Sequence, residues 1–300
     1  LIYIYLVLTS LCAISYKILG MNFFDSLTHS MTTIATGGFS NYNESIGHFN
    51  NVKIEITAML FIILGSLPFI AYIKFLNGNR KVFLNDSQIK TFIKLIIFSI
   101  LILFFYLFIK IEDFSLSDFR YISFNSISIL TGTGYVTGKF DQWGSFSLFF
   151  FLILMFIGGC AGSTACGIKI FRLQMLLIFL KNQIKKLIYP NSVIITKYNN
   201  QKISNDFIRS VIIFIFSFLF IFLIIAMLLS ISGLDFVTSI SGAASSISNV
   251  GPGLGEIIGP DGNYKSLPDL SKWILASGML LGRLELFAVL VLFFPSFWRN

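Results

Sequence analysis

Residues 118–135 read DFRYISFNSISILTGTGY, and this stretch decides the fold. An aspartate followed by phenylalanine opens it, and a glycine 16 residues after the aspartate ends a turn rich in glycine and threonine. The same pattern, with asparagine or aspartate first, occupies residues 22–38 and 235–251, and every copy lies between two apolar segments. Such backbone survives at membrane depth only where it lines a watery cavity or is packed within protein. The three copies therefore predict re-entrant pore loops with internal pseudosymmetry.

The composition is that of a membrane protein. Hydrophobic residues make up 55% of the chain and charged residues only 12%, and the mean hydropathy is +0.82. A helical span needs about 20 apolar residues. The candidate spans are 1–19, 55–76, 89–110, 145–180, 207–232 and 272–297. Pro68 is expected to kink the second, and the fourth is too long for one simple span and contains a glycine-rich break at 158–167.

The net charge of +8 is unevenly distributed. Lysine and arginine gather around 77–90 and 181–206, whereas the loops at the opposite ends of the spans carry more carboxylates. Basic loops face the cytoplasm, so the pore loops are entered from outside. The lysines are confined to short segments beside spans, which argues against a nucleic-acid partner.

Span, pore loop and span follow one another three times, in residues 1–76, 89–180 and 207–300. Cytoplasmic linkers at 77–88 and 181–206 join these units. Fused repeats build a binding site or pore between them, and four two-span units close a ring. We therefore expect an all-α membrane protein with a pseudo-fourfold ion pore, in which the first unit is missing and the second, third and fourth are present.

Each pore loop is expected to begin with a short helix that runs inward, at 23–35, 119–131 and 236–248. Asparagine and aspartate side chains accept backbone N–H bonds at helix starts. The predicted caps are Asn22, Asp118 and Asp235. The carboxyl ends of the helices, each with about half a negative charge, then point at the membrane centre and favour a cation there.

The turns after these helices supply backbone carbonyl groups. Glycine adopts the positive φ that such turns need, and rings of carbonyl oxygens replace the hydration shell of potassium in selective filters. The alternative is a set of ordinary glycine-rich turns in a transporter, but the fixed offset from the capping residues favours a filter. The predicted potassium ligands are Ala35, Thr36, Gly37, Gly38, Thr131, Gly132, Thr133, Gly134, Ser248, Asn249, Val250 and Gly251.

The break at 158–167 lies in the second span of its unit, where it can sit beneath the filter. Each glycine disfavours helix by about 1 kcal/mol relative to alanine, and small side chains let the segment flex. The segment is either a gating loop or a site where another helix packs closely. The predicted gate residues are Gly158, Gly159, Gly162, Ser163, Thr164, Gly167, Lys169 and Arg283.

Arg283 is the most informative single residue. It lies well inside the last span, where a charge is costly and usually faces a cavity or a partner. It can raise the barrier to cations and contact the 158–167 loop, or it can pair with Glu285 or Glu55. Lys169 is expected to extend its ammonium group to the cytoplasmic face.

The remaining polar and sulfur-bearing residues of the spans are expected to be structural. Cys12, Cys160 and Cys166 have no histidine or carboxylate beside them, so we expect small apolar fillers, without disulfides or a metal. His29, in the first short helix, is expected to be a hydrogen-bonded packing residue. The sequence contains neither a His-Glu-x-x-His nor a Gly-x-Ser-x-Gly motif, so no enzyme is predicted.

Several motifs together resemble the Trk potassium-uptake family, within the Trk/Ktr/HKT superfamily of cation transporters. Residues 33–40 (TIATGGFS), 131–135 (TGTGY) and 247–255 (ISNVGPGLG) look like its second, third and fourth filter loops. Residues 158–169 (GGCAGSTACGIK) resemble its intramembrane loop, although a cysteine stands at 166 where a glycine is expected. Residues 282–285 (GRLE) resemble its last span.

The resemblance implies potassium uptake through a backbone-carbonyl filter, gated by the intramembrane loop, in a multi-pass protein of the bacterial inner membrane. It also implies a homodimer and a cytoplasmic nucleotide-binding Trk regulatory subunit that docks near 77–90 and 181–206. Potassium is then the transported ion, bound at the filter residues only, and no cofactor is expected. The alternative is a sodium-coupled secondary transporter of another cation or a small solute, which also uses broken helices.

Overall fold

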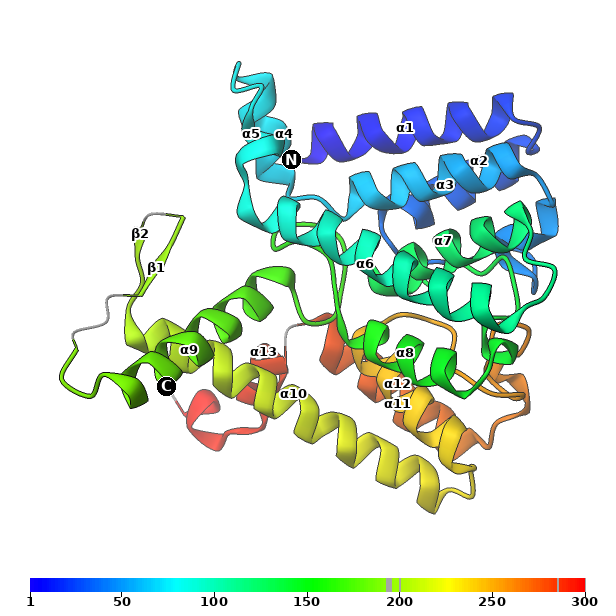
Figure 1. Ribbon diagram of the computed structural model, residues 1–300. Helices are drawn as coiled ribbons and strands as arrows, with labels where there is room; N and C mark the ends of the chain where they lie inside the picture. The colour runs from blue at the N-terminus through cyan, green and yellow to red at the C-terminus, as the bar shows by residue number, and fades with distance from the viewer. Residues whose placement is uncertain (193–195, 200, 285, 300) are drawn as a thin grey trace.

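The computed structural model describes residues 1–192, 196–199, 201–284 and 286–299, and Figure 1 shows a helical protein. The strands in this part of the chain form one small hairpin, in which β1 (Lys197–Tyr198) pairs antiparallel with β2 (Gln201–Lys202). The expectation of an all-α membrane protein is confirmed.

Three groups of helices follow one another along the chain (Figure 1). The first contains α1 (Ile2–Ile18), α2 (Phe23–Ile34), α3 (Val52–Gly65) and α4 (Phe69–Leu76). The second follows the short α5 (Val82–Asn85) and contains α6 (Ser87–Lys110), α7 (Leu116–Leu130), α8 (Ser145–Phe156) and α9 (Ile170–Ile188). The third contains α10 (Asn205–Ile231), α11 (Phe236–Ser248), α12 (Asp269–Arg283) and α13 (Leu286–Leu290). Short 3-10 turns lie at Ser45–Phe49, Phe140–Trp143, Tyr264–Ser266, Val291–Phe293 and Pro295–Trp298.

The second and fourth predicted spans are interrupted where the sequence indicates a kink and a break. Within the described ranges, α6 and the Asp206–Ile231 part of α10 are long and apolar enough to cross a membrane unbroken. Helices α3 and α4 pass the same test as a pair bent by 86°, with Pro68 directly before α4, so the predicted kink is confirmed. The long 145–180 stretch divides into α8 and α9 on either side of the glycine-rich break.

The three short helices are capped by side chains, as their sequences predict, with one correction. Asn22 accepts the N–H of Asp25 at 2.7 Å, and Asp235 accepts the N–H of Thr238 at 3.1 Å. The prediction that Asp118 caps α7 is wrong. Ser115 is the N-cap, and Asp118 is the third helical residue of a capping box. The serine three residues earlier adds nearly a turn to the start of α7 because it closes this reciprocal pair of bonds.

Each short helix packs against longer helices of its own group, and the groups meet where α3 contacts α7 and where α8 contacts α11. The basic linker after α4 and the hairpin lie on the left of Figure 1, and the turns into α2, α7 and α11 lie on the right. Phe98 and Phe105 of α6, and Phe216 and Phe220 of α10, are exposed. Such apolar outer faces suit contact with lipid.

Candidate ion pore and gate

The three glycine turns, at 35–38, 131–134 and 248–251, lie edge to edge. A Cβ on Gly38 would come within 1.9 Å of the carbonyl oxygen of Thr133, and a Cβ on Gly134 within 1.7 Å of that of Val250. Gly251 has a looser neighbour, the Cα of Gly134 at 4.0 Å from its Cβ position. The structure therefore brings all twelve predicted ligands together, in the order of the three groups. Side chains larger than hydrogen do not fit at the first two contacts.

The turns have positive φ at two matching positions despite their differences in sequence. Positive φ occurs at the ending glycine of each, with 63° at Gly38, 82° at Gly134 and 112° at Gly251. It also occurs two residues earlier in each turn. These earlier residues are Thr36 (49°), Gly132 (70°) and Asn249 (54°). A β-branched residue rarely takes positive φ, so the strain at Thr36 marks a conformation that the surrounding structure imposes.

Hydrogen bonds to the preceding short helices hold the turns. The N–H groups of Gly37 and Thr133 donate to the carbonyls of Thr32 (2.8 Å) and Ser128 (2.9 Å). In the third turn, Val250 donates to the Ser245 carbonyl at 3.0 Å. The middle turn is buried, whereas the outer two border a common cavity of about 480 Å³. The backbone of the first and third turns therefore lies beside an open cavity.

Second spans press against the carboxyl ends of two short helices. A Cβ on Gly65 of α3 would lie 2.8 Å from the carbonyl oxygen of Ile34, the last residue of α2. A Cβ on Gly282 of α12 would lie 1.8 Å from the carbonyl oxygen of Ile247, near the end of α11. These glycines let the spans reach the negative helix ends closely.

The 158–167 loop lies directly beneath the first turn. The Thr164 hydroxyl donates to the carbonyls of Ile34 (2.8 Å) and Gly65 (3.0 Å), and it accepts from the Thr36 hydroxyl at 3.3 Å. Gly132 of the second turn also approaches it, with 3.8 Å between its Cβ position and the Cys166 nitrogen. The loop therefore reaches under more than one of the three turns.

The same loop satisfies the backbone that the bend at Pro68 leaves unpaired. The Cys160 N–H donates to the Ser66 carbonyl at 3.1 Å, and the Phe69 N–H donates to the Gly162 carbonyl at 2.9 Å. A helix that breaks within a membrane must find such partners. The broken span of the first group and the loop of the second are therefore one hydrogen-bonded unit.

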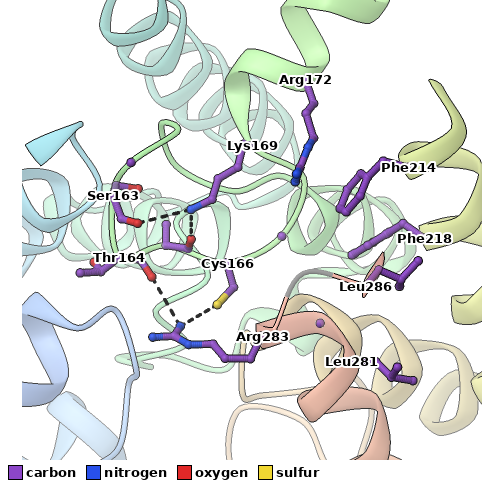
Figure 2. A pocket seen from close by; sticks show the side chains of 14 residues that line it. Ser163, Thr164, Cys166, Lys169, Arg172, Phe214, Phe218, Leu281, Arg283 and Leu286 are labelled. Carbon is purple, nitrogen blue, oxygen red and sulfur yellow. Dashed lines mark hydrogen bonds between the residues drawn. The ribbon is translucent and has the colours of Figure 1, made fainter. Parts of the chain in front are cut away.

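Arg283 reaches the loop from the third group. Figure 2 shows its guanidinium donating to the Cys166 thiol, at 2.7 Å, and to the Thr164 carbonyl, at 3.4 Å. The predicted contact with the loop is confirmed. The alternative pairing with Glu55 is wrong, because Glu55 binds Arg120 of α7 at 3.0 Å. Glu285, the other carboxylate considered, lies outside the described residues.

Lys169 departs from its prediction. Its ammonium group donates to the carbonyls of Ala165 and Ser163 and so turns back onto the loop instead of reaching the cytoplasmic face (Figure 2). Three cationic residues, Lys169, Arg172 and Arg283, line one cavity of about 380 Å³ beside the loop. Positive charge therefore gathers on this side of the loop.

The loop glycines serve close packing within the loop as well as the helix break. A Cβ on Gly158 would lie 1.8 Å from the Cys166 carbonyl oxygen, and the N–H of Gly158 donates to Ile168 at 3.0 Å. Gly159 would meet the Ser66 carbonyl at 3.0 Å. Gly162 and Gly167 take positive φ, of 76° and 72°. The two ends of the loop thus pair with each other while its middle extends under the turns.

Sequence reasoning missed Tyr135, the residue after the second turn. It is fully buried, and its hydroxyl donates to the His29 carbonyl at 3.0 Å and bonds to the Thr32 hydroxyl, both in α2 of the first group. The sequence feature that could have indicated this role is an aromatic residue directly after the Gly-Thr-Gly turn. His29 is a hydrogen-bonded packing residue, as predicted, with ring bonds to the Asp25 carbonyl (2.8 Å) and the Ser40 hydroxyl (3.0 Å).

All three cysteines are buried, which agrees with the expectation of small fillers, but one of them has a further role. Cys12, Cys160 and Cys166 are buried and free. In the ranges that the structure describes, no group of three or more His, Cys, Asp and Glu side chains could hold a metal ion. Cys166 is nevertheless more than an apolar filler, because it accepts the hydrogen bond from Arg283.

The turns with paired positive-φ positions, the loop beneath them and the repeated helix groups define a membrane protein built from similar helical units. The sequence profile of the TrkH family, described as cation transport protein, matches residues 1–299, and the chain belongs to this family.

Named relatives and a solved structure are similar along nearly the whole chain. The Trk system potassium uptake protein TrkI of Halomonas elongata is 42% identical over 298 residues, which cover 99% of this chain and 60% of that protein. TrkH of Escherichia coli K12 is 33% identical, with 99% and 61% covered. The crystal structure of the potassium transporter TrkH from Vibrio parahaemolyticus superposes with a TM-score of 0.92 at 33% identity, and the match covers 99% of this chain and 64% of that one. The chain spans about three fifths of the length of these curated relatives.

Proposed function

We propose that the chain takes part in potassium uptake across the bacterial inner membrane, with the three glycine turns as parts of a carbonyl selectivity filter. The observation that carries the proposal is the shared pair of positive-φ positions in turns that abut one another. Three copies of one repeat adopt these positive-φ positions at the ends of helices whose negative ends favour a cation. The names of the relatives, potassium uptake proteins, support potassium as the ion.

In this proposal, residues 1–76, 89–180 and 207–300 are the second, third and fourth units of a pseudo-fourfold pore. The 158–167 loop obstructs the path beneath the filter, and Arg283 holds it there. The assembly is a homodimer, and a nucleotide-binding Trk regulatory subunit docks near 77–90 and 181–206. The protein transports an ion without catalysing a reaction and needs no cofactor.

The filter is tested by cation flux in vesicles that contain the full-length protein. We expect Gly38→Ser, Gly134→Ser and Gly251→Ser each to lower the ratio of potassium to sodium flux, because serine disfavours the positive φ of these turns. Gly78→Ser is the matched control, since Gly78 has positive φ but open space around it. An unchanged flux ratio in all three filter variants refutes the assignment, and uptake that requires a sodium gradient supports the coupled transporter instead.

The gate is tested by deletion of residues 161–165. The shortened loop no longer reaches Ile34 and Gly65 beneath the first turn. We expect potassium flux to rise while the flux ratio stays the same. Thermal unfolding is measured in parallel. A folded deletion protein with unaltered flux places the gate elsewhere, and an unfolded one shows that the loop is a packing element.

A further inference from the structure

The hairpin β1–β2 packs against the helix that leaves the 158–167 loop. Tyr198, at the end of β1, is half-buried, and its ring meets Phe171 of α9 edge-on, with the ring centroids 5.0 Å apart. Phe171 follows Lys169 by two residues, so the hairpin touches the chain just where the loop ends. The hairpin lies in the basic 181–206 linker, away from the turns that begin the short helices (Figure 1).

The Tyr198 hydroxyl joins this hairpin to two helices. It donates to the Gln174 side-chain oxygen of α9 at 2.8 Å and accepts from the Ser87 hydroxyl of α6 at 3.0 Å. The Gln174 amide donates onward to the Ser87 carbonyl (2.9 Å) and the Thr91 hydroxyl (2.7 Å). Burial raises the pKa of Tyr198 above its usual value, so the phenol keeps its proton at neutral pH.

The first turn of α6 also holds the 158–167 loop. Asp86 caps this turn by accepting the N–H groups of Gln88 (2.8 Å) and Ile89 (3.3 Å). The side chain of Gln88 is therefore not needed as a cap, and its oxygen accepts the N–H of Ala161 at 2.9 Å. Ala161 lies three residues before Thr164, which is bonded beneath the first turn.

A continuous set of contacts thus leads from the hairpin to the loop. Resting on the proposed function, we propose that Tyr198 is a positioning residue for the gate. Its hydroxyl fixes the start of α6, and Gln88 in that turn holds Ala161 and with it the loop beneath the filter. Displacement of the hairpin at the cytoplasmic surface releases the loop. The filter turns stay in place because each keeps its backbone hydrogen bonds to its own short helix, and the bonds of Tyr198 and Gln88 involve none of residues 35–38, 131–134 or 248–251.

The test is hydrogen–deuterium exchange of backbone amides in the full-length protein, held in lipid nanodiscs. Tyr198→Phe removes the hydroxyl and keeps the ring against Phe171. We expect amides 159–165 to exchange about fivefold faster, the population change that loss of one ordinary hydrogen bond produces. Gln88→Leu has the same effect, and the double variant exchanges no faster than Gln88→Leu alone, because both lie on one path. Tyr189→Phe is the matched control, since Tyr189 is exposed in the same linker.

Potassium and sodium flux are measured on the same variants. We expect Tyr198→Phe to raise potassium flux by a similar factor with an unchanged ratio of the two ions, which a filter defect would alter. Unchanged exchange at 159–165 in Tyr198→Phe overturns the proposal. Equally fast exchange in α7 also overturns it, because the loosening is then global. If exchange at 159–165 quickens but no variant or parent protein conducts potassium, the positioning role stands and the proposed function fails.

Discussion

A Cβ placed on Gly134 would lie 1.7 Å from the carbonyl oxygen of Val250, so the turn of the second helix group is fitted against the turn of the third. Gly38 is fitted against Thr133 in the same way. The width of the predicted ion path therefore depends on contacts between units as well as on the conformation of each turn. This relationship gives the sharpest mutational test.

We expect Gly134→Ala to destabilise the protein by about 3 kcal/mol. A non-glycine residue in left-handed conformation costs about 1 kcal/mol, and overpacking adds about 2 kcal/mol. The same variant should also have a lower ratio of potassium flux to sodium flux. Gly233→Ala is the control, because Gly233 has a φ of 92° but no atom within 4 Å of its Cβ position. This variant should lose only the conformational part of the free energy of unfolding. Equal losses of stability in the two variants would refute the packing argument.

Arg283→Ala should raise potassium flux at least about tenfold, because the loss of even one charge-assisted hydrogen bond, worth about 1.5 kcal/mol, shifts the equilibrium of the loop by about a factor of ten. The hydrogen bonds of Arg283 tie Cys166 and Thr164 to α12. Lys272→Ala, on the same helix and in an exposed ion pair with Asp269, should leave flux unchanged. Potassium flux measured in vesicles for both variants tests whether Arg283 keeps the path closed. A drop in flux for Arg283→Ala would show that the arginine opens the path.

The Glu55–Arg120 ion pair connects α3 of the first group to α7 of the second, and Glu55 is buried. We expect Glu55→Gln to lower the free energy of unfolding by about 3 kcal/mol, since a charge that loses its buried partner is strongly destabilising. The double variant Glu55→Gln, Arg120→Gln should lose less than the sum of the two single losses. Glu44→Gln, at an exposed carboxylate of the same group, should change stability little. Additive losses would mean that the two charges do not interact.

Asp25 ties the start of α2 to the segment after the first turn. Its carboxylate accepts hydrogen bonds from Asn41 and Tyr42, each at 2.8 Å, and from Asn22 at 2.7 Å. Burial alone would raise the pKa of Asp25, but the bonds from Asn41 and Tyr42 hold it below the usual value. The stabilisation is therefore full above about pH 4, the ordinary value for aspartate, and is lost as the pH falls through the lower folded-state pKa.

The variant Asp25→Asn should accordingly be less stable than the parent protein at neutral pH, and the difference should shrink as the pH falls below about 4. Thermal unfolding across this range measures the effect. Asp269→Asn, at an exposed carboxylate, serves as the control. A stability difference that is independent of pH would contradict the role of the charged carboxylate.

The sequence predicted features that local patterns determine. The turns, the short helices, the bend at Pro68 and the break at 158–167 all follow from residue types at fixed spacing. Contacts between residues distant in the chain were harder to predict from the sequence. Arg283 could equally have met Glu55, and the structure pairs Glu55 with Arg120 instead. The choice depends on how α3, α7 and α12 pack, which spacing does not determine.

Two other predictions were wrong, the cap of α7 and the position of the Lys169 ammonium group, and both depend on residues nearby in the chain. Ser115 precedes Asp118 by three residues, the spacing of a capping box, and the longer α7 follows from it. Lys169 lies at the cytoplasmic end of an apolar stretch, where snorkelling is the usual behaviour. In the folded chain, however, its ammonium group donates to the carbonyls of Ala165 and Ser163 in the loop just before it.

The interlocking of the turns has a consequence for biosynthesis. Chains emerge from the ribosome in order, and domains generally fold as units with the N-terminal part first. Gly134 cannot take its final place against Val250 until residues 207–300 have been made and inserted. The turn at 131–134 therefore lacks its contact with Val250 while the third group is synthesised. Slow insertion of α10 and α12 would prolong the exposure of this backbone, so helices made after the second group determine when its turn becomes native.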